Sequence, residues 1–490
     1  MHVASVDLGS NSFRLQIGRV EAGKIIPVNY FKDGVRIAAG LDEKGNLSQE
    51  AQERALKTLS KFKALLVGFP TSHVRAVGTQ TLRVAKNAPE FIEKAQKALG
   101  YPIEVLRGNE EARLIFVGCS HALPPSRARR LFVDIGGAST ELSVGQGYQA
   151  QICSSFHIGC VSLTLAYFAD GVITKSRFEA AQLAAYSQLI EARKVFSAPQ
   201  IWDEAYGSSG SMEAVCSIAR ILGLGDDGIS QHDLVQIRDY FIRCGEINKL
   251  QLEDLHQSRR DVIAGGLAVL CAVFEALGIE RMAFSSGALR MGVLYDLQDK
   301  LNSNDCRTQS IDRLLSFVQW DREQTARVDL LSSMLMCSLV PDGLDEEKKC
   351  LHWAAQLHEI GTNISHNGFH RHGAYIVEHA DLVGFSASTQ CWIADLILAQ
   401  RGALQEFNEQ MRDSAWTLSL LCLRLACIFA QERTSARLPE LQLLSLGARH
   451  FELRIKSTGW LETHPLIKFL LDGEVKHWKA VQYTFDFCYC

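Results

Sequence analysis

The sequence predicts an α/β protein with two related lobes, followed by a helical half and a small α+β segment. Two segments, 3–18 and 131–145, alternate apolar and polar residues around a turn of small residues, a pattern typical of β-hairpins. From about residue 305 the apolar spacing changes to that of helices. With 490 residues, of which 47% are hydrophobic, the chain has enough apolar material for several cores.

The two predicted hairpins share one motif. Residues 6–12 read VDLGSNS and residues 133–139 read VDIGGAS, so each holds an aspartate between apolar residues, then a glycine and a serine. A motif that recurs within one chain indicates two copies of one domain design. We therefore expect two similar lobes that face each other across a cleft.

Helical patterns and composition shifts set the expected boundaries. In the first lobe, helices are predicted over 48–67, with Ser48 as N-cap, and over 88–99 before Gly100. In the second lobe, helices are predicted over 175–196 and 259–277, with a last strand at 281–285. The expected domains are 1–124, 125–304, 305–436 and 437–490.

Composition excludes several classes of protein. The 51 Lys and Arg residues nearly balance 55 Asp and Glu, so neither nucleic-acid nor general membrane-surface binding is indicated. The start of the chain lacks the features of a signal peptide, and the apolar stretch 416–430 is short and contains Arg424, which predicts a buried helix. The 14 cysteines include no CxxC pair, which favours a reducing, cytoplasmic location; peripheral membrane association stays open.

Loops that follow the two aspartates are suited to phosphate. Glycines and hydroxyls placed directly after a strand can surround phosphate oxygens with N–H and O–H groups. One such string alone is more often a plain turn, but two copies and a third Gly/Ser turn at 207–211 favour a common anion site. The predicted phosphate-binding residues are Ser10, Asn11, Ser12, Gly136, Gly137, Ser139, Gly207, Ser208, Ser209, Gly210 and Ser211.

Asp134 and Glu141 are the predicted metal ligands. They lie seven residues apart across the second hairpin, so both carboxylates can point at one site if the strands pair at Gly136 and Gly137. Mg²⁺ commonly takes one or two protein carboxylates and leaves its other positions to water and phosphate; Mn²⁺ could substitute. The alternative places Glu141 on a solvent-facing surface.

Two further charged positions have two readings each. Asn109 is predicted to be the N-cap of a helix with Glu110 and Glu111 in its first turn, where acidic residues either serve a site or only interact with the helix dipole. Arg83 fits either a helix-surface cation or a phosphate clamp.

Three segments together, DLGSNS at 7–12, GNEEAR at 108–113 and DIGGASTEL at 134–142, resemble the Ppx/GppA phosphatase family in order and spacing. The likeness continues through 159–162, 207–211, 260–263, 287–290 and 357–361, so it spans essentially the whole chain in the family's long form. Two residues depart from the family pattern: Met291 replaces an expected glutamate, and Ala138 replaces a frequent third glycine.

The resemblance implies an actin-like pair of lobes, which is a duplicated ribonuclease-H-like (ASKHA) fold. It implies that Glu111 is the catalytic glutamate, that Asp134 and Glu141 are the magnesium-side carboxylates, and that Arg83 faces phosphate. The expected activity is that of an exopolyphosphatase, in which water attacks the terminal phosphate of inorganic polyphosphate with help from Mg²⁺. The alternative is a 5'-phosphohydrolase of guanosine pentaphosphate (pppGpp) that makes ppGpp in the stringent response. A homodimer is also expected.

Residues 305–436 resemble a degenerate HD-type helical domain. The HD signature requires an aspartate after its histidine, but Glu359 follows His358, so a structural or anion-binding role is favoured over a metal site. A polyanion track is predicted at His366, His370, Arg371 and His372, with a solvated surface as the alternative.

Two other classes of function remain as alternatives. An actin-fold kinase would transfer phosphate from ATP to an acceptor, and a non-catalytic sensor would bind ppGpp without releasing phosphate.

Overall fold

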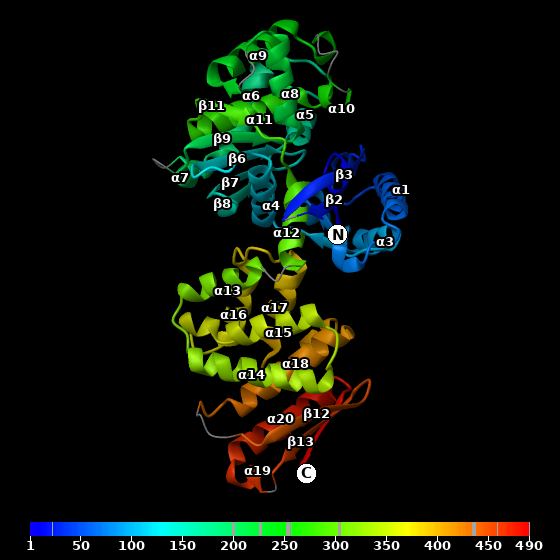
Figure 1. The fold of residues 1–490 in the computed structure, drawn as a ribbon, viewed down its shortest axis with the longest axis vertical. Coiled ribbons are helices and arrows are strands. Elements are labelled where there is room, and N and C mark those ends of the chain that lie inside the picture. The colour runs from blue at the N-terminus through cyan, green and yellow to red at the C-terminus, as the bar shows by residue number, and fades with distance from the viewer. Residues whose placement is uncertain are drawn as a thin grey trace. The chain divides into compact units, whose positions relative to one another are not determined.

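The computed structural model describes residues 1–21, 23–197, 201–224, 228–250, 255, 257–301, 305–433, 438–457 and 459–489. The chain divides into two compact units, Met1–Asp305 and Cys306–Cys490 (Figure 1). Each unit has an apolar core of its own.

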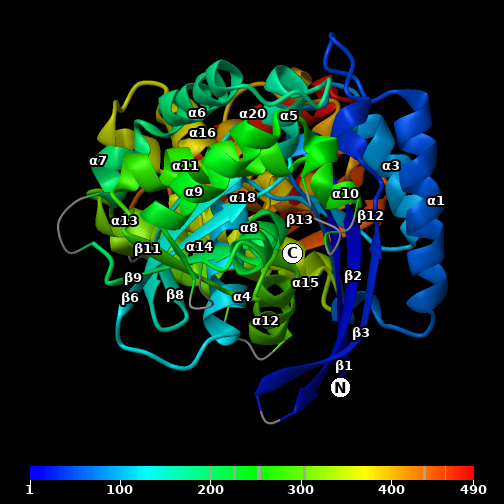
Figure 2. The same cartoon turned by 90° about the horizontal axis from the view of Figure 1, so that it is seen from above.

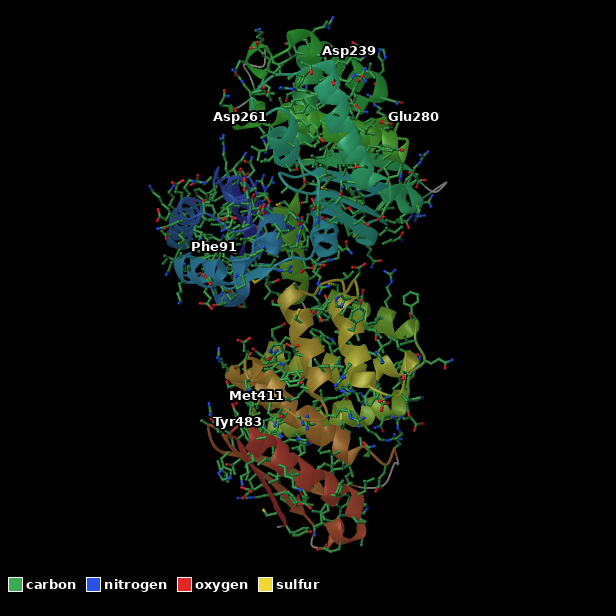
Figure 3. All side chains as sticks on the ribbon, turned by 180° about the vertical axis from the view of Figure 1, so that it is seen from behind. Phe91, Asp239, Asp261, Glu280, Met411 and Tyr483 are labelled. Atoms are coloured by element: carbon green, nitrogen blue, oxygen red, sulfur yellow. The ribbon has the colours of Figure 1, made fainter. Side chains whose placement is uncertain are left out.

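The first lobe is a five-stranded sheet with helices beside it. The strand order is β3-β2-β1-β4-β5, in which β1 to β3 are antiparallel and β4 and β5 run parallel to β1. Helices α1 and α3 lie side by side next to this sheet, and Phe91 is fully buried there (Figures 2 and 3). The elements are β1 (His2–Leu8), β2 (Phe13–Glu21), β3 (Lys24–Asp33), α1 (Gln49–Leu65), β4 (Val74–Gly78), α2 (Gln80–Val84), α3 (Ala88–Leu99) and β5 (Ile103–Val105).

The second lobe repeats this arrangement. Its order is β10-β11-β9-β6-β7-β8, with β6 to β8 antiparallel, β9 parallel to β6, and β11 parallel to β9. The duplicated sheet confirms the predicted actin-like α/β fold. The strands are β6 (Arg129–Ile135), β7 (Thr140–Gln146), β8 (Gln149–Phe156), β9 (Glu204–Ser208), β10 (Ile229–Ser230) and β11 (Arg281–Phe284). The helices are α5 (Cys160–Tyr167), α6 (Lys175–Leu189), α7 (Ala192–Phe196), α8 (Ser209–Ile221), α9 (Gln231–Cys244), α10 (Gln257–Arg260) and α11 (Ile263–Leu277).

Two helices cross between the lobes. Helix α4 (Gly108–His121) packs on β7 and β8 of the second lobe, and α12 (Leu289–Leu301) packs on α4 and on β1 of the first. A boundary between residues 124 and 125 assigns each helix to the lobe whose sheet it does not cover. The crossing is close because of glycine: a Cβ on Gly292 would lie 1.7 Å from the Leu114 carbonyl oxygen, and one on Gly118 2.3 Å from that of Ala288.

Local signals mark several helix ends where the sequence predicts them. Ser48 caps α1 through its side chain, and α3 ends at Gly100 with φ 83°, a left-handed conformation that glycine adopts readily. The predicted helix over 175–196 is instead divided into α6 and α7, and that over 259–277 is divided into α10 and α11. Among the described residues, no helix combines the length and apolar character that a membrane crossing requires.

The second unit is a helical bundle with a small sheet. Trp416 on α18, Leu453 on β13 and Trp478 on α20 belong to one continuous core, so the described residues from 438 onward share the core of the helices before them. Tyr483 also donates a hydrogen bond to the Met411 carbonyl (3.2 Å; Figure 3). The helices are α13 (Cys306–Ser316), α14 (Arg322–Leu339), α15 (Asp345–Leu357), α16 (Phe369–His379), α17 (Ala387–Ala399), α18 (Ser414–Phe429), α19 (Trp460–Thr463) and α20 (Pro465–Ala480). The sheet order is β12-β13-β14, formed by β12 (Glu440–Gly447), β13 (His450–Lys456) and β14 (Thr484–Tyr489).

Candidate active site

A cavity of about 400 Å³ opens between the two hairpins of the first unit; we call it the cleft cavity. Both lobes contribute to its wall, and most of the residues predicted for phosphate, metal and catalysis line it. These are Ser10, Asn11, Ser12, Glu111, Asp134, Gly136, Gly137, Ser139, Glu141, Ser209 and Gly210. The structure therefore brings distant segments of the sequence to one place.

Three predicted phosphate-binding residues lie outside the wall of the cleft cavity. Ser208 is fully buried and donates its hydroxyl to Asp134 Oδ2 (2.6 Å), while Ser211 donates to the Ile135 carbonyl (3.0 Å). Gly207 faces Met212, whose side chain a Cβ would meet at 2.6 Å. These residues support the strand-to-helix turn and the carboxylate rather than facing a ligand.

The second hairpin holds two carboxylates on one face. Asp134 pairs directly with Glu141 in the antiparallel register of β6 and β7, so both side chains point the same way. Glu141 is 2% exposed and accepts a hydrogen bond from the Ser155 hydroxyl (2.8 Å). The solvent-facing alternative for Glu141 is therefore wrong.

The first hairpin has the same register with a different charge pattern. Asp7 pairs directly with Arg14, whose Nη1 forms an ion pair with Asp7 Oδ2 (2.9 Å). The other carboxylate oxygen, Oδ1, is buried and has no hydrogen-bond partner among the described residues. Sequence reasoning missed this pair, although extending the motif comparison by two residues would have aligned Arg14 with Glu141.

Glu111 reaches the cleft cavity from α4. This helix begins at Gly108, so Asn109 lies inside the helix and is not its N-cap. Arg83 donates to Glu111 Oε2 (2.7 Å) and to the Leu106 carbonyl (2.8 Å), but it does not line the cleft cavity. Arg83 thus orients the Glu111 carboxylate without lining the cavity itself.

Four carboxylates, Asp7, Glu111, Asp134 and Glu141, form an acidic cluster at the cleft cavity. Burial raises the pKa of Glu111 to about 7; Arg83 opposes this rise, while Asp7 and Asp134 add to it. Burial also raises the pKa of Asp134, and burial together with Glu111 and Asp134 raises the pKa of Glu141 well above its usual value. The cluster therefore favours either protons or a bound cation.

The acidic cluster fits a hard divalent cation. In the described part of the chain, no three His, Cys, Asp or Glu side chains are arranged to enclose a metal ion by themselves. Mg²⁺ needs no such enclosure, since water and phosphate oxygens complete its coordination. The two carboxylates of Asp134 and Glu141, which lie opposite each other in the second hairpin, are suitable donors.

Positive side chains line the same cavity, and one of them, Arg14, is the ion-pair partner of Asp7 in the acidic cluster. Arg14, Lys32, Arg259 and Arg290, which we call the cationic rim, come from both lobes and from α12. Burial and the nearby Arg259 and Arg14 lower the pKa of Lys32 to about 8, which shows how closely these charges gather. A bound anion would relieve their repulsion. The sequence gives little sign of this rim because its members lie far apart along the chain.

A loop connects the first hairpin with the second lobe. The N–H of Arg36 donates to the Asn11 carbonyl (2.9 Å), which ties the loop to the first phosphate hairpin. The Arg36 side chain pairs with Asp261 of the second lobe (3.0 Å; Asp261 is labelled in Figure 3).

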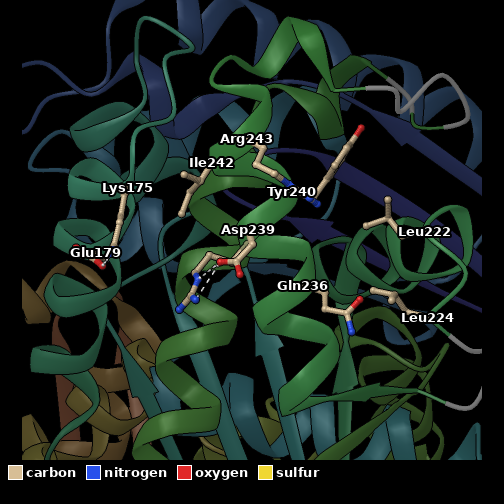
Figure 4. Close-up of a pocket in the computed structure, with 10 residues that line it drawn as sticks. Lys175, Glu179, Leu222, Leu224, Gln236, Asp239, Tyr240, Ile242 and Arg243 are labelled. Carbon is tan, nitrogen blue, oxygen red and sulfur yellow. Dashed lines mark hydrogen bonds and ion pairs between the residues drawn. The ribbon is translucent and has the colours of Figure 1, made fainter.

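A second recess, of about 760 Å³, lies on the second lobe beside α9 (Figure 4). Its lining charges are mixed, and Arg238 pairs with its neighbour Asp239 (3.0 Å). It therefore lacks the converging groups that mark the cleft cavity.

The predicted track residues belong to the second unit, in and just before α16. His366 and Arg371 are exposed, whereas His370 and His372 are partly buried. Their role as a polyanion track stays a prediction.

In the HD-like region, a guanidinium binds the carboxylate that follows His358. Arg433 forms ion pairs with both Asp321 (3.0 Å) and Glu359, so an arginine supplies the positive charge there.

Comparisons with known proteins agree with this geometry. Residues 16–301 match the model of the Ppx/GppA phosphatase family, and residues 306–475 match the model of Ppx/GppA phosphatase domain III. A solved exopolyphosphatase-like protein is 27% identical, with a TM-score of 0.54 and coverage of 61% of this chain and 100% of its own. The Ppx/GppA enzyme of Aquifex aeolicus is 26% identical (TM-score 0.51; 60% and 99% coverage). An exopolyphosphatase of Cytophaga hutchinsonii, at 24% identity, shares the fold (TM-score 0.56; 61% and 98% coverage). The chain belongs to the Ppx/GppA phosphatase family.

Proposed function

We propose that the protein is an exopolyphosphatase that hydrolyses the terminal phosphate of inorganic polyphosphate and releases orthophosphate. The observation that carries this proposal is the pairing of an acidic cluster with a cationic rim in one cavity. Transfer of a phosphoryl group to water needs a base for the water and positive charge around the phosphate oxygens. The two halves of the cleft cavity offer these separately.

In the proposed mechanism, Glu111 accepts a proton from the attacking water. Its raised pKa, about 7, suits a general base at neutral pH, and Arg83 fixes the orientation of its carboxylate. Asp134 and Glu141 would hold Mg²⁺, which supplies positive charge to the phosphate oxygens when bound. The hairpin loops surround the terminal phosphate, and the cationic rim binds the phosphates of the leaving chain.

The lining of the cleft cavity favours polyphosphate over pppGpp. A guanine base would need a flat aromatic or apolar surface, whereas a phosphate chain needs repeated positive charge. Among the described lining residues the aromatic rings are those of Tyr30 and Phe284, and the Arg290 guanidinium already lies 5.0 Å from the centre of the Tyr30 ring.

The test measures phosphate release from long-chain polyphosphate and from pppGpp, with and without Mg²⁺. Glu111→Gln is expected to lower kcat by about 10²–10⁴-fold with little change in KM, because it removes the base but keeps the shape. Glu53→Gln, an exposed change on α1, is the control and should match the unmodified protein.

Each other outcome points elsewhere. Undiminished turnover by Glu111→Gln would remove this residue from the mechanism. A higher kcat/KM for pppGpp would identify a pentaphosphate hydrolase. Phosphate transfer from ATP to an acceptor would indicate a kinase, and binding of ppGpp without phosphate release from either substrate would indicate a sensor.

A further inference from the structure

Helix α4 carries two adjacent glutamates that serve different surroundings. Glu111 faces the cleft cavity, whereas Glu110 is 3% exposed and binds Arg113 with both carboxylate oxygens (2.8 and 2.7 Å). The Glu110–Arg113 pair lies within α4 and turns with it, so a contact of this pair with another element is needed to fix the rotation of the helix. Successive residues of an α-helix point about 100° apart, so such a contact also sets the direction of Glu111.

Asp296 on α12 joins this pair to a second buried arginine. Its Oδ1 accepts a hydrogen bond from Arg113, and its Oδ2 accepts one from Arg75 Nη1 (2.5 Å). The side chains of Arg75, Arg113 and Asp296 are 3%, 9% and 4% exposed. Although burial opposes it, the attraction of Arg113, Lys300 and Arg75 holds the pKa of Asp296 well below its usual value. One charged carboxylate thus separates two buried cations that would otherwise repel each other.

The partners of Asp296 come from the elements that carry the proposed catalytic pair. Arg75 lies on β4, which leads directly into α2 and Arg83; Arg113 lies on α4, two residues after Glu111. The β4–α2 segment is therefore joined to α4 twice. The Arg83–Glu111 ion pair forms one connection, and Asp296, which binds both Arg75 and Arg113, forms the other.

We propose that Asp296 and Arg113 are positioning residues that fix the rotation of α4 and so hold Glu111 against Arg83 at the reacting phosphate. This inference rests on the proposed role of Glu111. A network whose every member is buried and paired specifies one arrangement of its elements, because each alternative leaves a charge without a partner. Such a network can also be purely structural, so the two roles must be separated by kinetics.

The experiment is a double-mutant cycle on polyphosphate hydrolysis with Mg²⁺. Arg113→Lys keeps the positive charge but loses the two-pronged contact with Glu110. We expect kcat to fall by about 10-fold or more while KM changes little, because only the placement of the base is altered. Placed in the Glu111→Gln background, the same change should cause no further loss of kcat, since the group it positions is already gone.

Two additional variants keep the test decisive. Arg424→Lys is the matched control: Arg424 is equally buried and binds Glu474 with two nitrogens (2.8 and 2.6 Å), but it lies in the second unit. It should lower thermal stability without changing kcat. Lys300→Met is the milder variant, to be used if Arg113→Lys impairs folding. It removes a partly exposed contact with Asp296 (3.4 Å), and we expect it to lower kcat in the same way but by a smaller factor.

Two failures can be told apart. If Glu111→Gln alone keeps full turnover, the proposed function of Glu111 is wrong. If Glu111→Gln lowers turnover but the losses from Arg113→Lys and Glu111→Gln multiply in the double variant, the network is structural and only the positioning inference is overturned.

Discussion

Asp7 and Asp134 occupy equivalent registers in two hairpins, yet the residues opposite them carry opposite charges. Arg14 neutralises Asp7, whereas Glu141 adds a second carboxylate to Asp134. A duplicated fold therefore presents one neutralised hairpin and one acidic hairpin to the same cavity. This asymmetry fits the proposed site, in which Asp134 and Glu141 would hold Mg²⁺ and phosphate would bind between the lobes.

Gly210 gives room for one member of the cationic rim. A Cβ at this position would lie 1.9 Å from Arg259 Nη2, so Gly210→Ala must displace the guanidinium. The clash involves only the far end of the Arg259 side chain, which can move, so the variant should keep about the stability of the unmodified protein. We expect KM for polyphosphate to rise by about 10-fold, corresponding to about 1.4 kcal/mol of lost binding.

The control for this prediction is Gly473→Ala in α20, where a Cβ would meet nothing within 4 Å. It should raise the melting temperature and leave KM unchanged. An unaltered KM in Gly210→Ala would show that Arg259 does not bind the chain.

At the scale of elements, the hairpins were predictable and the crossing helices were not. A hairpin is encoded locally, by alternation and a small-residue turn, and the register of Asp134 with Glu141 follows from its length. Which sheet α4 and α12 cover depends on backbone contacts, such as those of Gly118 and Gly292, between segments far apart in sequence. For the same reason the sequence indicated the acidic residues in motifs but missed Lys32 and Arg259.

The buried carboxyl of Glu141 in the β6–β7 hairpin should make the stability of the protein depend on pH. The folded-state pKa of Glu141 is raised, so the native protein binds protons more readily than the unfolded chain. The free energy of unfolding therefore falls as the pH rises above about 4.3, the pKa of a glutamate in the unfolded chain. Glutamine does not ionise, so without metal Glu141→Gln should melt a few degrees higher than the unmodified protein at pH 8 (~2–4 °C per kcal/mol).

This gain should disappear near pH 4, where the carboxyl is protonated in both states. Added Mg²⁺ should also reduce this difference in melting temperature, because the ion would bind and stabilise the unmodified protein more than Glu141→Gln. Thermal unfolding followed by circular dichroism at several pH values gives the comparison, with Glu93→Gln, exposed on α3, as the control. An equal melting temperature at every pH would contradict the raised pKa of Glu141.

At the scale of the whole molecule, the two units have separate cores, and every group of the proposed chemistry lies in the first. Their melting should therefore occur in two calorimetric transitions. A non-hydrolysable polyphosphate analogue with Mg²⁺ at about 100 times its Kd should stabilise the first unit by about 2.7 kcal/mol and leave the other transition in place. One cooperative transition that shifts as a whole would show that the units are energetically coupled.

The ion pair of Arg36 with Asp261 has a consequence for a long, flexible polymer. Both side chains are substantially exposed, and such a pair contributes about 0–1 kcal/mol, close to thermal energy. The ion pair can therefore be broken at little cost, while the backbone hydrogen bond from Arg36 to Asn11 attaches the loop to the first hairpin. On the proposed function, this contact between the lobes would offer little resistance to a polyphosphate chain that reaches it.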